Sequence, residues 1–179
     1  MPMRCFVAID MTEEVKNELK KLQLQIRNNS GSSKISFTKD FHLTLKFLGE
    51  LTPQKAEFVK KRLGSCKFRK FETALGDTGF FSSKGYIRVV WAGISPEEEA
   101  LKLQREVDEA LQGYFPKEKG FNAHLTLARV KYVSDKDRFL QLLKKLKAEK
   151  IRFAVNDFKL KRSTLTKEGP VYDDLAVYK

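Results

Sequence analysis

Cysteine and histidine, the residues that most often bind zinc, are scarce in this sequence. Among its 179 residues are two cysteines and two histidines. Cys5 and Cys66 have the spacing of neither a zinc site nor a redox pair. They could pair with each other, but two free thiols in a reducing compartment are the simpler interpretation. Asp40 lies near His42 and nothing equivalent precedes His124, so a zinc ion would lack ligands and we expect no metal.

Long apolar runs and nucleotide-binding loops are also missing. No stretch approaches the roughly 20 apolar residues that cross a bilayer. The start, Met1-Pro2-Met3-Arg4, lacks the apolar core of a signal peptide, so we expect a cytoplasmic protein without a membrane partner. The absence of a Walker A loop and of an acidic metal-binding cluster argues against nucleotide-driven and two-metal mechanisms. We therefore expect no cofactor.

Acidic residues are too few to balance the basic ones. Lys and Arg number 35 against 23 Asp and Glu, for a net charge of +12. The basic residues concentrate in two runs and a short group after the second run: Lys60, Lys61, Arg62, Lys67, Arg69 and Lys70; Lys144, Lys145, Lys147, Lys150 and Arg152; and Lys159, Lys161 and Arg162. A charge-rich surface like that of thermophile proteins is one interpretation, but such surfaces are enriched in both Lys and Glu. Because the acids do not balance the bases here, we favour a surface that faces RNA.

One tetrapeptide occurs twice and contains both histidines. It reads His42-Leu43-Thr44-Leu45 in the first half of the chain and His124-Leu125-Thr126-Leu127 in the second. The surrounding residues favour strands, and a strand directs residues i and i+2 to the same face. Each motif is therefore predicted to present one imidazole and one hydroxyl on one face, with its two leucines packed in the core. A structural role for a lone histidine would be ordinary, but core packing does not require the same polar pair twice.

The similarity between the halves extends beyond the motifs. Each half is predicted to run in the order strand, helix, histidine strand, helix and strand. In each half the histidine precedes the cap of the next helix by ten residues; that cap is Thr52 in the first half and Ser134 in the second. The predicted first strands are 5–9 and 87–91, and the last are 68–75 and 151–165. The stripes of the first helices are Val15, Leu19, Leu22 and Ile26, and Ala100, Leu103, Val107 and Leu111. We predict one domain, 1–179, with an internal duplication (halves about 1–85 and 86–179) and two α+β lobes related by a pseudo-twofold axis. The imidazoles would then face each other across a cleft.

Two imidazoles and two hydroxyls suit phosphoryl transfer without a metal. One imidazole can deprotonate the nucleophile while the other protonates the leaving oxygen, and Thr44 and Thr126 can donate to the phosphate oxygens. Lys46 is in phase with His42 and is expected in the cleft as a substrate-binding residue. Arg129 is a second candidate, although it is out of phase with His124 and needs a twist or strand end to reach the cleft. Phe47, Phe80 and Phe81 are candidates for stacking on bases.

These motifs resemble those of the two-histidine (2H) phosphoesterase superfamily. Within it, the sequence is most similar to the RNA 2′,3′-cyclic phosphodiesterases of archaea and bacteria, also called LigT-like proteins or 2′-5′ RNA ligases. The resemblance covers essentially the whole chain. Apart from the motifs, it rests on four segments: Arg4 to Asp10, Lys46 to Gly49, Arg88 to Gly93, and Ala128 with Arg129.

The resemblance implies a fold and a reaction. The fold has two α+β lobes, each with an antiparallel sheet and outer helices, around a central cleft. The reaction is hydrolysis of a terminal 2′,3′-cyclic phosphate on RNA to a 2′-phosphate, with reversible 2′-5′ ligation as a side activity. By resemblance His42 is the proton donor and His124 the proton acceptor, an assignment that the duplicated motif alone leaves open. We expect a monomer whose partner is an RNA end, such as that of a tRNA fragment.

Two alternatives to this function remain. A non-catalytic RNA-binding module would share the basic surface without depending on the histidines. A cyclic phosphodiesterase for small nucleotides would keep the chemistry without needing the basic surface. Salt discriminates the two substrates: if RNA is the substrate, high salt should weaken turnover of RNA ends without a matching loss for mononucleotides.

Overall fold

The chain forms four helices and nine strands in the residues that the computed structural model describes, 1–167 and 169–179. The helices are α1 (Glu13–Asn29), α2 (Pro53–Leu63), α3 (Glu98–Ala110) and α4 (Lys136–Lys145). The strands are β1 (Met3–Asp10), β2 (Lys34–Phe37), β3 (His42–Leu51), β4 (Phe71–Ser83), β5 (Tyr86–Ser95), β6 (His124–Tyr132), β7 (Arg152–Val155), β8 (Phe158–Thr166) and β9 (Gly169–Tyr178). The predicted α+β class is confirmed.

The strands form one antiparallel sheet that is weakly joined at its middle. Their order is β7-β4-β5-β6-β3-β1-β8-β9, with β2 paired to β6. We call β1, β3, β8 and β9 with α2 and α3 the first lobe, and the other strands with α1 and α4 the second lobe. Within the described residues the two motif strands β3 and β6 share a single ladder pair, Leu43 opposite Leu125. The sheet is therefore continuous in pairing but consists of two lobes.

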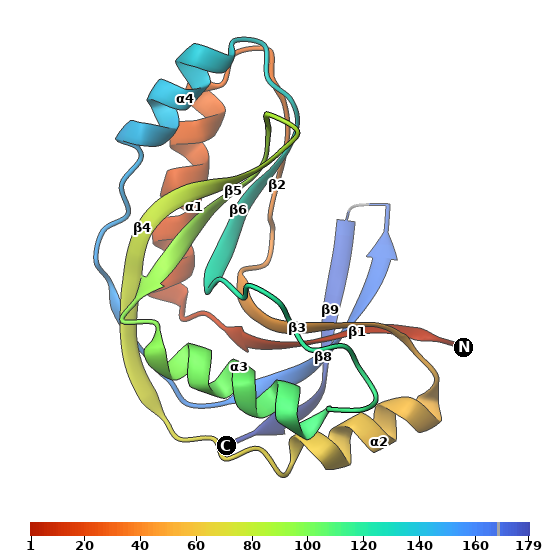
Figure 1. Ribbon diagram of the computed structural model, residues 1–179. Coiled ribbons are helices and arrows are strands. Elements are labelled where there is room, and N and C mark those ends of the chain that lie inside the picture. The colour runs from red at the N-terminus through yellow and green to blue at the C-terminus, as the bar shows by residue number, and fades with distance from the viewer. Residues whose placement is uncertain (168) are drawn as a thin grey trace.

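The lobes do not coincide with the two halves of the sequence. Helix α1 follows β1 in the chain but packs against β6 and α4, whereas α3 follows β5 but packs against β3 and α2 (Figure 1). Strand β8, from the second half, pairs with β1 from the first. Each half thus contributes a helix to the other half's sheet. This exchange places both motif strands at the centre of one core.

Local signals explain where three of the helices begin. The side chains of Thr12 and Thr52 accept hydrogen bonds from the backbone N–H groups of Val15 and Lys55, which confirms both predicted caps. The cap predicted at Ser134 is wrong, because α4 is capped by Asp135, whose side chain accepts from the backbone N–H of Arg138. Among the described residues, no helix combines the length and apolar character needed to cross a bilayer.

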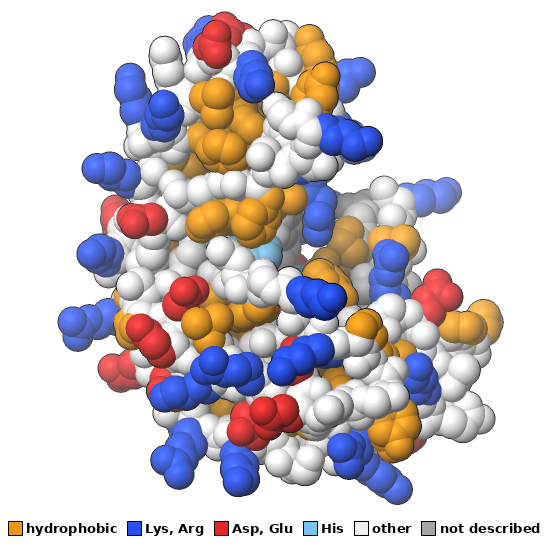
Figure 2. Space-filling view, viewed as in Figure 1, with side chains coloured by type: hydrophobic (Ala, Val, Ile, Leu, Met, Phe, Trp, Pro, Cys, Tyr) orange, Lys and Arg blue, Asp and Glu red, His pale blue; other side chains and the backbone are white. Residues whose placement is uncertain are grey.

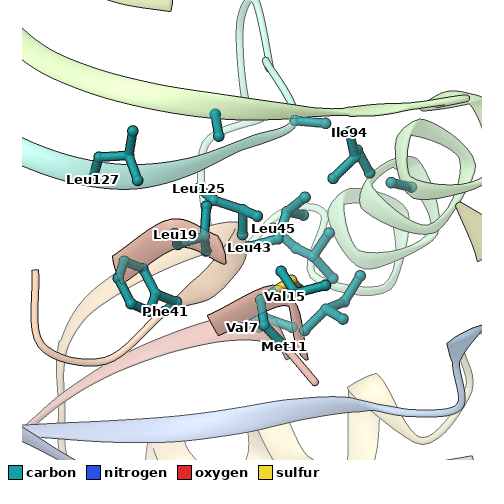
Figure 3. Packing of buried hydrophobic residues seen from close by; sticks show 14 of the residues in the cluster. Val7, Met11, Val15, Leu19, Phe41, Leu43, Leu45, Ile94, Leu125 and Leu127 are labelled. Carbon is teal, nitrogen blue, oxygen red and sulfur yellow. The ribbon is translucent and has the colours of Figure 1, made fainter. Parts of the chain in front are cut away.

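The motif leucines lie at the centre of the core. Leu43, Leu45, Leu125 and Leu127 are each at most 1% exposed, and Figure 3 shows them together with side chains of α1. Burying such a side chain contributes about 1.5–3 kcal/mol. The predicted stripes of α1 and α3 are buried as well. This packing confirms the predicted direction of the leucines and turns the alternate positions of both strands toward the opposite face.

Candidate active site

The two motifs lie side by side on the face of the sheet opposite the leucines. Because Leu43 pairs with Leu125 in antiparallel register, His42 lies across from Thr126 and Thr44 across from His124. All four side chains are half-buried. Two imidazoles and two hydroxyls thus occupy four neighbouring positions where the sheets of the two lobes meet.

A β-bulge follows the threonine of the first motif and changes which later residues share its face. Val7 of β1 pairs with Lys46 and the next residue, Ala8, pairs with Thr44, so Leu45 is the extra residue. Leu45 and Lys46 are consequently both buried, and Phe47 is 69% exposed. The expectation that Lys46 lies in the cleft is wrong: its ammonium group is buried against Asp108, away from the imidazoles. Phe47 takes the imidazole face instead.

The second motif strand has a bulge at the equivalent position. Trp91 of β5 pairs with Thr126, and Val90 pairs with Ala128, so Leu127 is the extra residue. The alternation of buried and exposed residues shifts by one, and Arg129 joins His124 on the imidazole face. The expectation that Arg129 is out of phase is therefore corrected, because strict alternation fails at a bulge.

A backbone carbonyl and two aromatic side chains hold the His124 ring. The Nδ1 atom lies 2.8 Å from the carbonyl oxygen of Asn122. A carbonyl only accepts hydrogen bonds, so Nδ1 carries the proton and Nε2 of the neutral ring has a free lone pair. The ring centroids of Phe81 and Trp91 lie 4.9 and 6.5 Å from that of His124. The tautomer and ring orientation of His124 are thereby defined.

The His42 ring has a different environment. Its centroid lies 4.8 Å from that of Phe6 and 5.0 Å from that of Tyr172. Its Nδ1 atom is buried and has no hydrogen-bond partner among the described residues. The two imidazoles, equivalent in sequence, are therefore unlike in structure.

Four charged residues form an ion-pair network beside His42. Lys159 and Lys161 of β8 each contact both Asp10 and Asp174, at 2.7–3.0 Å. Burial would raise the pKa of Asp10, but hydrogen bonds from both lysines outweigh it and keep that pKa below its ordinary value. Asp10 also pairs with His42 across β1 and β3. The network carries two positive and two negative charges, and its Lys161 and Asp10 act on the pKa of His42 in opposite directions.

Burial lowers the pKa of both imidazoles. For His42 burial is the largest effect, and the positive charges of Lys161 and Arg129 add to it; although Asp40 and Asp10 oppose the change, the pKa falls to about 4. For His124 burial again dominates and Arg129 contributes, while the bond to Asn122 opposes. The charge of Arg129 thus acts on both rings, as expected from its position on the imidazole face of β6.

The low pKa of His42 predicts a loss of stability in acid. The unfolded chain binds a proton at this residue near pH 6.5, whereas the folded chain binds it only near pH 4. Protons therefore favour unfolding, and the free energy of unfolding should fall by up to about 3 kcal/mol as the pH drops from 6.5 to 4. Urea denaturation of the wild-type protein and of His42→Gln at pH 7, 5.5 and 4 measures this fall in the free energy of unfolding. We expect a smaller fall in the variant, in which His124 with its lowered pKa still contributes, and an equal fall would contradict the assigned burial. Asp10 and Asp174, whose pKa values lie below the ordinary 3.8, lose most of their contribution only below pH 4.

The basic runs lie away from the imidazoles. The first includes the last turn of α2 and the second the last turn of α4, and both helices cover the leucine face of the sheet. Lys159 and Lys161 are paired with acids, as is Arg162 with Asp173. In Figure 2 imidazole surface is visible beside a hollow between the lobes, with basic side chains at its rim. The predicted runs are thus not the wall of the site.

Several residues around the imidazoles escaped the sequence prediction. None of these was predicted as a site residue: Phe6, Tyr172, Asp10, Asp174, Lys159 and Lys161. Phe6 and Asp10 lie in a segment of the resemblance, and the alternate lysines of β8 beside the acids of β9 were a further usable signal. Of the aromatic candidates, Phe81 contacts His124, whereas Phe80, 37% exposed, alternates to the other face of β4. The described residues include no group of three or more His, Cys, Asp or Glu side chains that could hold a metal.

The sequence matches a family model described as LigT like phosphoesterase over residues 9–91 and 93–172. It is 34% identical over 178 residues to the RNA 2′,3′-cyclic phosphodiesterase of Archaeoglobus fulgidus, covering 98% of this chain and 99% of the relative. The enzyme of the same name from Thermotoga maritima is 35% identical over 176 residues, covering 95% and 91%. These matches span both motifs.

Solved structures with the same arrangement of elements are known. The crystal structure of TT0787 of Thermus thermophilus superposes with a TM-score of 0.77 at 29% identity, covering 98% of this chain and 97% of that one. Escherichia coli LigT complexed with 3′-AMP has a TM-score of 0.76 at 23% identity, covering 99% and 98%, a likeness that concerns the fold. Family model, full-length relatives and fold agree: the chain belongs to the LigT-like phosphoesterases, a family of two-histidine enzymes.

Proposed function

We propose that this protein hydrolyses the 2′,3′-cyclic phosphate at the 3′ end of an RNA to a 2′-phosphate, with its two imidazoles as general acid and general base. The observation that carries the proposal is the group His42, Thr44, His124 and Thr126 on one face of paired strands, with Arg129 further along the same face of β6. The names of the Archaeoglobus and Thermotoga relatives support the substrate class. One chain supplies every one of these groups, so a monomer suffices.

His124 acts as the general base. Since Nδ1 donates to the carbonyl oxygen of Asn122, the lone pair of Nε2 is available to accept a proton from water. The oxygen of that water forms a bond to phosphorus, opposite the bond to the 3′ oxygen. A positioned base of this kind contributes typically 10²–10⁴-fold in rate. The bond to Asn122 stabilises the imidazolium that results.

His42 acts as the general acid. The bond between phosphorus and the 3′ oxygen breaks, and that oxygen takes the proton of the His42 imidazolium, leaving a 3′-hydroxyl and a 2′-phosphate. With a pKa of about 4 in the free protein, the His42 imidazolium is a stronger acid than an ordinary imidazolium and is rarely present at neutral pH. A bound phosphate anion beside the ring raises this pKa, because an opposite charge favours the protonated form. Solvent then returns both imidazoles to their starting states.

The remaining groups bind the substrate. Thr44 and Thr126 donate their hydroxyl protons to the non-bridging phosphate oxygens, and the guanidinium of Arg129 balances the developing negative charge. Phe47, exposed beside Phe6 at a centroid distance of 6.3 Å, offers an aromatic surface for a base. If a 5′-hydroxyl takes the place of water, the same geometry joins two RNA ends through a 2′-5′ linkage.

The proposal is tested with an oligoribonucleotide that ends in a 2′,3′-cyclic phosphate. We expect hydrolysis by the wild-type protein in excess EDTA and a product whose phosphate is on the 2′ oxygen, which ³¹P NMR identifies. A product with a 3′-phosphate would contradict the assigned leaving group. Activity that EDTA removes and a divalent metal ion restores would contradict acid–base catalysis by the imidazoles alone.

The same assay distinguishes RNA ends from small nucleotides. Lys and Arg contacts to an RNA backbone weaken as counterions compete, so binding of the oligonucleotide should fall steeply with salt. A cyclic mononucleotide carries a single phosphate, so its binding should weaken little as the salt concentration rises. If kcat/KM for both substrates has the same salt dependence, the protein acts on the terminal nucleotide alone, and the RNA part of the proposal is wrong.

A further inference from the structure

A buried glutamine of α1 joins segments from both halves of the chain. The Nε2 group of Gln23 donates hydrogen bonds to the carbonyl oxygens of Thr38, at 2.7 Å, and Leu127, at 2.8 Å. Leu127 is the extra residue of the bulge in β6, and Thr38 lies in the segment that leads into His42. The backbone N–H of Thr38 also donates to Leu127, at 3.0 Å. We call these bonds the Gln23 clamp.

A buried ion pair between α3 and β3 also joins segments from both halves of the chain. The ammonium group of Lys46, from the bulge in β3, donates to Asp108 and to the carbonyl oxygen of Pro116. Asp108 also accepts from the side chain of Gln104, at 2.8 Å, and from the backbone N–H of Glu118, at 3.0 Å. Pro116 and Glu118 lie in the segment that leads into His124. We call these bonds the Asp108 clamp.

The two clamps occupy equivalent places in the two halves. Gln23 and Asp108 each follow the first residue of their helix, Glu13 and Glu98, by ten positions. Each clamp joins the bulge of one motif strand to the segment that precedes the other motif. Both are buried: Gln23 is 8% exposed, Lys46 3% and Asp108 5%.

Direct pairing of the motif strands is too limited to position the imidazoles by itself. Leu43 opposite Leu125 is the one ladder pair between β3 and β6 in the described part of the chain. A bulge also leaves backbone groups outside the ladder, as the carbonyl of Leu127 illustrates by accepting from Gln23 and Thr38. The clamps supply the missing polar partners at the places where the two strands diverge from regular pairing.

We propose that Gln23 and the Lys46–Asp108 pair are positioning residues that set the spacing and orientation of the two catalytic imidazoles. The inference rests on the proposed function for its catalytic consequence. Neither clamp touches the substrate face; each acts through the backbone that holds a histidine. In particular, the Asp108 clamp reaches His124 through the segment from Pro116 to Asn122, although Lys46 lies on the strand of His42.

The test compares Gln23→Met and Lys46→Met with Thr73→Val in the full-length protein. Met has nearly the length of either side chain but no hydrogen-bonding group. Thr73 is the matched control, because it is 3% exposed and donates one buried hydrogen bond to the carbonyl oxygen of Pro96, away from both motifs. Two readouts are taken: hydrolysis of the oligoribonucleotide with a 2′,3′-cyclic phosphate, and ¹⁵N NMR of the imidazoles, of which the chain has two.

We expect Gln23→Met to lower kcat by about 10- to 100-fold while KM changes by about twofold or less, because misplacement by about 1 Å acts on the chemical step. Thr73→Val should change kcat by about twofold or less. The ¹⁵N shifts of both rings should change in Gln23→Met, and those of His124 in Lys46→Met. If Lys46→Met does not fold, the test uses Gln23→Met, which removes no charge, and the double variant Lys46→Met/Asp108→Asn.

Each outcome is separable from the proposed function. An active wild type with unchanged kcat and ¹⁵N shifts in Gln23→Met overturns the inference and leaves the function intact. An inactive wild type overturns the function, and the ¹⁵N shifts alone then decide the inference: unchanged rings contradict it and displaced rings support it. Equal losses in Gln23→Met and Thr73→Val also overturn it.

Discussion

His42→Ala and His124→Ala should each lower kcat for hydrolysis of the cyclic phosphate by about 10²- to 10⁴-fold. Each variant removes one of the two proton transfers and leaves the hydroxyls and Arg129 in place, so KM should change far less than kcat. The double variant should be little worse than the poorer single one, since residues that act as a unit are not additive. Single-turnover rates with saturating enzyme measure the chemical step, and circular dichroism checks that each variant is folded.

A substrate with sulfur in place of the 3′ oxygen separates the two roles. A thiolate leaves without being protonated, so this substrate needs the base but not the acid. It should restore most of the rate of His42→Ala and little of that of His124→Ala. Equal rescue of both variants, or rescue of His124→Ala alone, would contradict the assignment of acid and base that the bond from His124 to Asn122 supports.

Arg129→Met should lower kcat/KM by about 10²- to 10³-fold, the loss typical of a group that stabilises charge in the transition state. The guanidinium is the positive charge that acts on both imidazoles, and it lowers the pKa of each. Its removal should therefore raise both pKa values, which ¹⁵N NMR titration measures independently of activity. Arg129→Lys should recover part of the activity, since it keeps the charge but not the bidentate geometry.

Lys131→Met is the matched control for Arg129. It removes the same charge from an exposed position two residues further along β6. We expect kcat/KM to change by about twofold or less and both imidazole pKa values to stay in place. Equal losses in the two variants would mean that Arg129 contributes through net charge alone, and an unchanged pKa in Arg129→Met would show that the guanidinium lies away from the rings.

The repeated motif was the part of the site that could be predicted from the sequence, because strand alternation is a local property. Val, Leu, Thr and Phe favour a strand, and period two then separates His42 and Thr44 from Leu43 and Leu45. The helices were predictable for the same reason: apolar stripes at helical spacing are buried in α1 and α3. Each of these conclusions depends on residues within a few positions of one another.

The same rule failed just past each motif. Period two assigned Lys46 to the imidazole face and Arg129 to the opposite one, and the bulges at Leu45 and Leu127 reversed both. A bulge is decided by pairing with a neighbouring strand, which the local sequence does not contain. Ala128, an apolar residue at a position expected to face the cleft, was the one local sign that the alternation shifts there.

Contacts between distant segments decided the rest of the site. The exchange of α1 and α3 between the lobes, Tyr172 beside His42, and the pairing of Asp10 with Lys159 and Lys161 join residues far apart in the chain. The sequence by itself determined which side chains we propose for the chemistry and which face of their strands they share. Tertiary structure decided how the two motifs differ, because burial, a carbonyl partner and nearby charges set the proton affinity of an imidazole, and identical tetrapeptides acquire those surroundings only on folding.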